Sequence, residues 1–171
     1  MVRVDGATRF VVGDGALAIQ AIGDREVPGV RVANRAQQVV ELPGGELLAL
    51  DLATGESETI LDELSPFYQW DPTGTTLLFS TVNQGDTTTF TWWTWEDGSV
   101  SELDTFVPSP IWFRDVVPFF DQYDQSAPMW DATGTSFAYP AIDGDQPVVV
   151  VQPIDGDAST IPDAIWATWS P

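Results

Sequence analysis

The sequence contains no cysteine and no histidine, and its six basic residues are all arginine, so lysine is absent as well. Without imidazole or thiol groups, a Ser-His-Asp triad, a Cys-His pair and a zinc site with the usual ligands are excluded. Without lysine, there is neither a Schiff base nor the lysine of a phosphate-binding loop. Only carboxylates, hydroxyls, tyrosine and arginine remain for chemistry. We therefore expect a protein that is not an enzyme and that binds no metal and no cofactor.

Positive charge is scarce and unevenly placed. The 171 residues include 26 acidic and six basic side chains, which gives a net charge of −20. Residues 1–35 sum to +1, whereas residues 36–171, with one arginine and 22 acids, sum to −21. Such a field repels nucleic acid and anionic lipid, and it tolerates a cationic protein partner or divalent ions. A solvated acidic surface adapted to salt is the alternative. No apolar run approaches the roughly 20 residues of a membrane-spanning helix, so we expect no membrane insertion.

A motif of tryptophan followed by a turn occurs twice in full. Trp70–Phe79 reads WDPTGTTLLF and Trp130–Tyr139 reads WDATGTSFAY, and a third copy begins at Trp169. Further turn signals follow the full copies at matching offsets, at Gly85 and Asp97-Gly98 after the first and at Asp145 and Asp155-Gly156 after the second. Asp, Pro and Gly in this order are typical of short hairpin loops. The chain is therefore predicted to be a repeat protein.

The segments between these turns are predicted to be strands, because they are rich in β-branched and aromatic residues and are bounded by Gly, Asp or Pro. They are Thr8–Val12, Ala16–Ile22, Leu47–Leu52, Thr75–Thr81, Thr87–Trp95 and Pro147–Gln152. No stretch shows uninterrupted helical periodicity. Four short strands in about 40 residues are typical of a propeller blade. We predict an all-β propeller of about four blades of four antiparallel strands. The predicted units are 1–27, 28–63, 64–104 and 105–163, followed by a closing strand at 164–171.

The two full motifs, together with Trp169-Ser170-Pro171, resemble the Trp-Ser-Pro-Asp-Gly repeat of TolB-like propellers. The resemblance covers about residues 28–171 and is clearest over 65–171. Aspartate stands in the serine position and threonine in the aspartate position, changes that keep the chemistry of the turn. The resemblance implies a non-catalytic propeller that binds proteins outside the cytoplasm, in the periplasm or at the cell surface. Propellers fused to serine peptidases are similar too, but no peptidase half is present here.

The first unit lacks an inner strand, and Ile165–Trp169 reads as an inner strand without a blade. Because unpaired sheet edges promote aggregation, we expect the tail strand to complete the first blade. Four units can form a four-bladed ring, half of a ring shared by two chains in a homodimer, or the C-terminal part of a larger ring. We favour the larger ring, because complete TolB-like rings have more blades. The start of the chain does not read as a signal peptide, so we expect the native N-terminus to lie upstream.

An insertion accounts for the wider spacing between the first two motifs and covers residues 107–126. It combines aromatic residues with an arginine and several aspartates, a combination favoured at protein-binding surfaces. The candidate binding residues are Trp112, Arg114, Asp115, Phe119, Phe120, Asp121, Tyr123 and Asp124. In the alternative interpretation the aromatic side chains pack over a blade, and Arg114 pairs with Asp115 or Asp121.

Two further patterns have a functional and a structural interpretation. Thr87–Trp95 carries tryptophan on both faces, which suits a carbohydrate platform or, more simply, a strand buried between blades. Asp143-Gly144-Asp145 and Asp155-Gly156-Asp157 suggest calcium, but neither continues into a calcium-binding loop, so both are predicted to be hairpin turns.

The sequence therefore predicts a non-catalytic, TolB-like interaction scaffold of the cell envelope. Two alternatives remain open at this point. One is a propeller-fold carbohydrate-active enzyme that uses an Asp/Glu pair, and the other is an accessory propeller domain of a peptidase.

Overall fold

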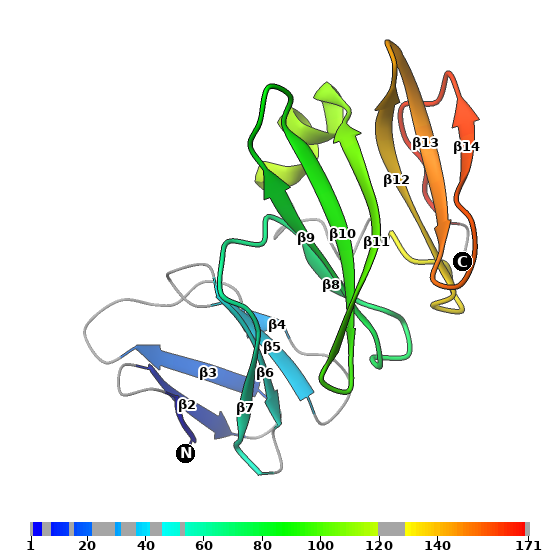
Figure 1. Ribbon diagram of the computed structural model, residues 1–171. Coiled ribbons are helices and arrows are strands. Elements are labelled where there is room, and N and C mark those ends of the chain that lie inside the picture. The colour runs from blue at the N-terminus through cyan, green and yellow to red at the C-terminus, as the bar shows by residue number, and fades with distance from the viewer. Residues whose placement is uncertain are drawn as a thin grey trace. The chain divides into compact units, whose positions relative to one another are not determined.

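The computed structural model describes residues 2–4, 8–13, 16–21, 30–31, 37–41, 46–51, 54–119 and 129–169. Within these ranges the chain is all-β, with antiparallel strands and one short helical segment (Figure 1). The fold is that of a β-propeller, in which successive sheets follow one another along the chain as blades. The chain divides into two compact units, Met1–Ser65 and Pro66–Pro171. No helix in the described ranges is long and apolar enough to cross a membrane.

The first unit contains two antiparallel sheets, each with its strands in chain order. Among the described residues of this unit, the first blade has three strands and the second has four. Their bounds are β1 (Val2–Val4), β2 (Thr8–Gly13) and β3 (Ala16–Ala21), then β4 (Val30–Arg31), β5 (Gln37–Glu41), β6 (Leu47–Asp51) and β7 (Ser57–Leu61). Leu47 to Leu50 are buried, as expected for a central strand that is covered on both faces.

The second unit contains one sheet that bends into two blades (Figure 1). The third blade consists of β8 (Tyr68–Trp70), β9 (Leu77–Asn83), β10 (Thr89–Glu96) and β11 (Ser99–Pro108). The fourth consists of β12 (Ser136–Asp143), β13 (Gln146–Pro153) and β14 (Ser159–Pro162), with a bridge from Trp130 to Phe137 at its inner side. Strands β11 and β12 pair at only two positions, so the two blades are joined at a corner and otherwise pack face to face.

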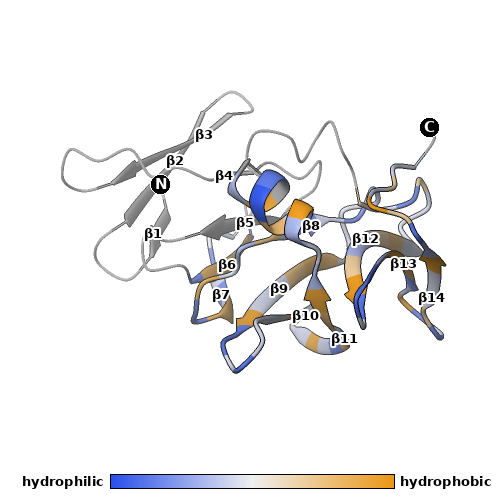
Figure 2. Cartoon of the chain, turned by 90° about the horizontal axis from the view of Figure 1, so that it is seen from above, coloured by the Kyte–Doolittle hydropathy of each residue, from blue (hydrophilic) through white to orange (hydrophobic). Residues whose placement is uncertain are grey.

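An aromatic core fills the space between the third and fourth blades. Trp92 from β10 lies 5.6 Å from Phe106 and 5.5 Å from Tyr139, measured between ring centroids. These side chains are at most 7% exposed. Burial, and then a hydrogen bond to Asp104, raises the pKa of Tyr139 and keeps its hydroxyl protonated. Figure 2 shows hydrophobic residues along the strands and hydrophilic residues at the hairpin loops. Burial of this apolar surface is the main force that joins the two blades.

Most predicted strands are confirmed, with shifts of one or two residues at their ends. Thr75–Thr81 corresponds to β9, Thr87–Trp95 to β10 and Pro147–Gln152 to β13. Ile165 to Trp169, the predicted tail strand, lie outside the strands that the structure defines. The partner predicted for this segment, the first blade, belongs to the other compact unit. The pairing of the tail with that blade stays a prediction.

The motif tryptophans hold equivalent positions in consecutive repeats. The indole N–H of Trp130 donates to the carbonyl of Gln69, the residue directly before Trp70, at 3.4 Å. The indole N–H of Trp169 donates to the carbonyl of Met129, the residue directly before Trp130, at 2.5 Å. Trp169 therefore contacts the fourth blade through the same kind of hydrogen bond with which Trp130 contacts the third. The repeat that the sequence predicts is present in the structure, although the described residues of the last copy, up to Trp169, form no strand.

Candidate interaction surfaces

The turn that follows each motif tryptophan is built by its aspartate. In the first copy the carboxylate of Asp71 accepts hydrogen bonds from the backbone N–H groups of Thr73, Thr75 and Thr76 at 2.7–3.0 Å. The backbone N–H of Gly74 donates to the carbonyl of Asp71, and Gly74 adopts a positive φ of 72°. One side chain thus satisfies three backbone donors of a tight turn. The predicted turn chemistry is confirmed, and the role of this aspartate is structural.

The second copy has the same local pattern. The carboxylate of Asp131 accepts hydrogen bonds from the backbone N–H groups of Thr133 and Thr135 at 3.2 and 3.0 Å. Partial burial acts to raise the pKa of Asp131, but the hydrogen bonds, chiefly from the backbone of Thr135, outweigh it and lower this pKa overall. Asp131 is half-buried, whereas Asp71 is only 5% exposed. The difference arises because Gly134 lies against Asp71: a Cβ placed on Gly134 would come within 2.7 Å of an Asp71 carboxylate oxygen.

The insertion begins with a helical turn that is anchored from inside by one tryptophan. After β11, residues Trp112–Val116 form a π-helical turn that continues into a 3₁₀ turn at Val117–Phe119. Trp112 is 1% exposed and packs 5.5 Å from Phe90 and 5.6 Å from Phe106, between ring centroids. Its backbone N–H donates to the hydroxyl of Ser109 at 3.1 Å. Trp112 was predicted as a binding residue, but its side chain lies in the aromatic core, which corresponds to the packing alternative.

The neighbours of Trp112 on the turn point outward. Phe113 is 51% exposed and Ile111 is 38% exposed. The guanidinium of Arg114 forms two hydrogen bonds of 2.7 Å with the carboxylate of Asp115, and both side chains are exposed. The hydrogen bond from Arg114 lowers the pKa of Asp115, and the same bond raises the pKa of Arg114. The predicted pairing of Arg114 with Asp115 is confirmed. The turn therefore presents two apolar side chains beside one exposed ion pair.

The other predicted binding residues cannot be placed beside this turn. Phe119 ends the 3₁₀ turn, but its side chain lies outside the described residues. The remaining four also lie outside the described residues, namely Phe120, Asp121, Tyr123 and Asp124.

The tryptophan-rich strand β10 is a packed strand and not a platform. Trp92 is fully buried and Trp95 is 2% exposed. The half-buried Trp93 donates its indole N–H to the hydroxyl of Thr81 at 3.0 Å. These positions confirm the prediction of a buried strand and leave no flat, exposed aromatic face on β10 for a sugar.

The two Asp-Gly-Asp segments lie in connections between strands. Asp143 pairs with Gln146, which makes Gly144-Asp145 the tip of the β12–β13 hairpin. Asp155-Gly156 lies between β13 and β14. Among the described residues, no group of three or more acidic side chains could hold a metal ion.

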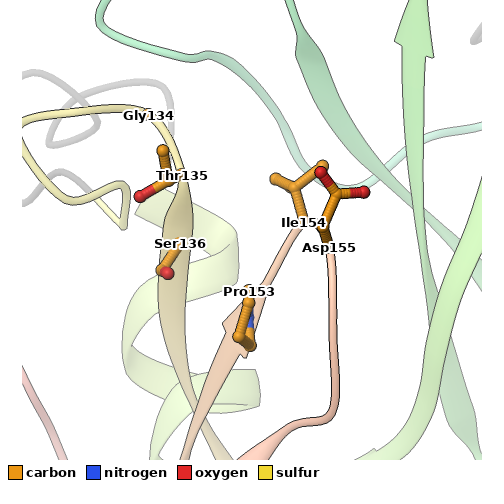
Figure 3. A pocket seen from close by; sticks show the side chains of 6 residues that line it. All are labelled: Gly134, Thr135, Ser136, Pro153, Ile154 and Asp155. Atoms are coloured by element: carbon orange, nitrogen blue, oxygen red, sulfur yellow. The ribbon is translucent and has the colours of Figure 1, made fainter.

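A pocket that the sequence analysis missed lies beside Ile154-Asp155 (Figure 3). On one side, a hollow of about 410 Å³ is lined by Thr135 and Ser136 from the fourth blade's motif turn and by Pro153. The backbone N–H of Ile154 donates to the carbonyl of Thr135 at 3.0 Å, which holds this segment in place. On the other side, Ile154 and Asp155 border a groove of about 550 Å³ that is also lined by the β10–β11 hairpin. Glu96, Asp97 and Glu102 of that hairpin line the groove.

No protein-family model matches the chain, and no curated protein matches it in sequence. Solved structures that are similar to it include the N-terminal domain of Nup159, at 14% identity and a TM-score of 0.44. That match covers 95% of this chain and 47% of the other. TolB from Acinetobacter baumannii is similar at 15% identity and a TM-score of 0.41, over 92% of this chain and 41% of the other. A third match is a chain of an S. cerevisiae complex of Dbp5 with Nup159 and Gle1, at 14% identity and a TM-score of 0.43, over 95% of this chain and 46% of that one. The chain spans less than half the length of each of these structures.

Proposed function

We propose that this chain is a non-catalytic interaction scaffold that binds a protein partner through the helical turn after β11. One observation carries the proposal: a rigid, buried anchor, Trp112, holds a turn whose neighbouring apolar side chains, Phe113 and Ile111, are exposed. Binding residues commonly lie on loops that a rigid scaffold positions. A large exposed aromatic side chain next to a charged pair is a typical centre of a protein-binding surface.

The arrangement around the turn favours recognition of a protein over chemistry. Arg114 and Asp115 neutralise each other, so the turn presents apolar area at its centre and a compensated ion pair at its side. Exposed ion pairs contribute little stability by themselves, but they orient a partner through complementary charge. We further propose, on the resemblance to TolB-like propellers, that the scaffold works outside the cytoplasm, in the periplasm or at the cell surface.

The surface is tested by site-specific photo-cross-linking. A photoreactive phenylalanine analogue is placed at position 113 of the full chain, and a matched control carries it at Asp86, an exposed residue in the β9–β10 turn. We expect a discrete cross-linked protein from position 113 in extract of the source cells and none from position 86. With that protein purified, Phe113→Ser should weaken binding about tenfold, as for a central interface residue.

Two results would contradict the proposal. Equal cross-linking from both positions would show that the turn has no special role. Hydrolysis of a glycan that is lost on a single Asp→Asn change would show that the chain is an enzyme. The proposed compartment is tested separately by fractionation of the source cells, and recovery of the protein in the cytoplasmic fraction would contradict that part alone.

A further inference from the structure

A second surface lies at the opposite end of the third blade. Because β11 runs from Ser99 to Pro108, the β10–β11 hairpin is at one end of the blade and the helical turn is at the other. The groove beside this hairpin has a volume of about 550 Å³, within the range of roughly 300–1,000 Å³ that is usual for ligand sites. It lies within one compact unit, with one wall formed by the β10–β11 hairpin and the other by Ile154 and Asp155 from the connection between β13 and β14.

The groove combines an acidic rim with an apolar wall. Glu96, Asp97 and Glu102 line it from the third blade, and Asp155 lines it from the fourth. All four carboxylates are exposed, and the half-buried side chains of Leu103 and Ile154 lie beside them. Lysine and arginine side chains are complementary to such a surface, because each has an aliphatic stem that can pack on an apolar wall and a cationic head that can pair with carboxylates. The groove therefore complements a basic side chain better than a compact ion.

Two observations show that the groove lacks a partner within the described part of the chain. The only arginine with a described side chain, Arg114, is paired with Asp115, so no described cation neutralises the four carboxylates. Thr94 also lines the groove and is 7% exposed, yet its hydroxyl makes no hydrogen bond among the described residues. This hydroxyl is not among the fully buried side-chain atoms without a partner, so it is open to the groove and available to a polar group of a ligand.

A metal ion does not fit these residues. Among the described residues, no three acidic side chains are close enough together to hold one. Calcium needs six to eight oxygen ligands at about 2.3–2.6 Å, which carboxylates spread along a groove do not provide. Spread carboxylates suit a series of cationic groups along an extended chain.

We infer that the acidic groove, defined by Thr94, Glu96, Asp97, Glu102, Ile154 and Asp155, binds a lysine- or arginine-rich segment of a protein partner. The aliphatic stem of a basic side chain packs on Ile154, its head group pairs with the carboxylates, and the hydroxyl of Thr94 accepts a hydrogen bond from it. This inference rests on the proposed role as an interaction scaffold, but it assigns the partner's chemistry to a surface separate from the helical turn.

The groove is tested with a short, unstructured peptide in which lysine and arginine alternate with serine and glycine. Binding to the full chain is measured by fluorescence anisotropy at low and physiological ionic strength. The triple variant Glu96→Gln, Glu102→Gln, Asp155→Asn should bind the peptide about tenfold more weakly, because three ion pairs are lost. Thr94→Val, which keeps the shape of the side chain, should weaken binding about threefold.

A matched control separates the groove from the overall negative charge. The triple variant Asp86→Asn, Asp143→Asn, Asp145→Asn removes the same number of charges from exposed turns at the other ends of these strands. We expect its affinity for the peptide to change less than about twofold, since charges beyond a Debye length of about 8 Å are largely screened. All variants are exposed-site or shape-conserving changes, and circular dichroism verifies that each one folds.

Equal weakening by both triple variants would overturn the inference, because the net charge alone would then explain binding. Binding of spermidine or calcium in the groove without binding of the peptide would also overturn it, because the site would then take a small cation and not a protein. Cross-linking at position 113 is independent of these measurements. If the peptide does not bind in the groove, the proposed scaffold role is unaffected. If the scaffold role is wrong, the cross-linking experiment at position 113 shows it.

Discussion

The two Trp-Asp turns have almost the same sequence and the same local hydrogen bonds, but their aspartates have different surroundings. Asp71 is 5% exposed, and Asp131 is half-buried. The motif turn of the fourth blade covers the motif turn of the third, with Gly134 against the Asp71 carboxylate. The local sequence therefore specifies the turn, whereas the position of the turn among the blades decides how strongly the same hydrogen bonds stabilise the fold.

The largest difference is expected when each aspartate is replaced by alanine. Asp71→Ala leaves three backbone N–H groups beneath the neighbouring turn without an acceptor, and we expect it to lower the free energy of unfolding by about 3 kcal/mol. Asp131→Ala exposes equivalent groups to water, and a loss of about 1 kcal/mol is expected. Chemical denaturation of both variants measures the difference. Equal losses would show that the covering turn has no energetic effect.

A smaller difference is expected for glycine replacements. Gly134→Ala requires a φ of +72° for alanine and places a Cβ 2.7 Å from an Asp71 oxygen, so we expect a loss of about 2 kcal/mol. Gly144→Ala is the matched control, because Gly144 also has a positive φ, +59°, but nothing lies within 4 Å of its Cβ position. Only the backbone cost of about 1 kcal/mol applies there. The same denaturation measurement applies, and a cost at Gly144 as large as that at Gly134 would argue against the close approach.

The smallest effect concerns pH. The pKa of Asp131 lies below its ordinary value of 3.8 in the folded chain, so its carboxylate stabilises the fold at pH values above about 4, and this contribution is lost as the pH falls through the lowered pKa. Because Asp131 is only half-buried, solvent screening limits the effect to no more than about 0.5 kcal/mol. Between pH 6 and pH 3, Asp131→Asn should therefore lose slightly less stability than the unmodified chain. Thermal unfolding at the two pH values tests this, and a steeper loss in the variant would contradict it.

The repeat and most strands could be predicted from the sequence because local chemistry produces them. The alternation of β-branched and aromatic residues in β9 and β10, and the Asp and Gly of each turn, act over a few residues and leave a visible pattern. The closing strand could not be settled in this way. Ile165 to Trp169 have the composition of a strand, but a strand also requires a partner edge, and that requirement is not local.

The candidate surfaces show the same limit. Trp112 and Phe113 are adjacent aromatic residues in one insertion, and nothing in their sequence distinguishes a core anchor from an exposed contact. Trp112 is buried because β11 ends at Pro108 and the following turn directs it toward Phe90 and Phe106. The acidic groove was not predicted at all, because Glu102 and Asp155 belong to different blades and meet only when the blades pack.

The sequence by itself determined the all-β repeat, the chemistry of its turns and the strong negative charge, since each of these depends on residue types and short spacings. Only the tertiary structure decided which aspartate is buried, which aromatic side chain of the insertion is exposed and which carboxylates share a groove. The physical reason is that burial and proximity are set by the packing of one blade on the next. That packing brings together residues that are far apart in the chain.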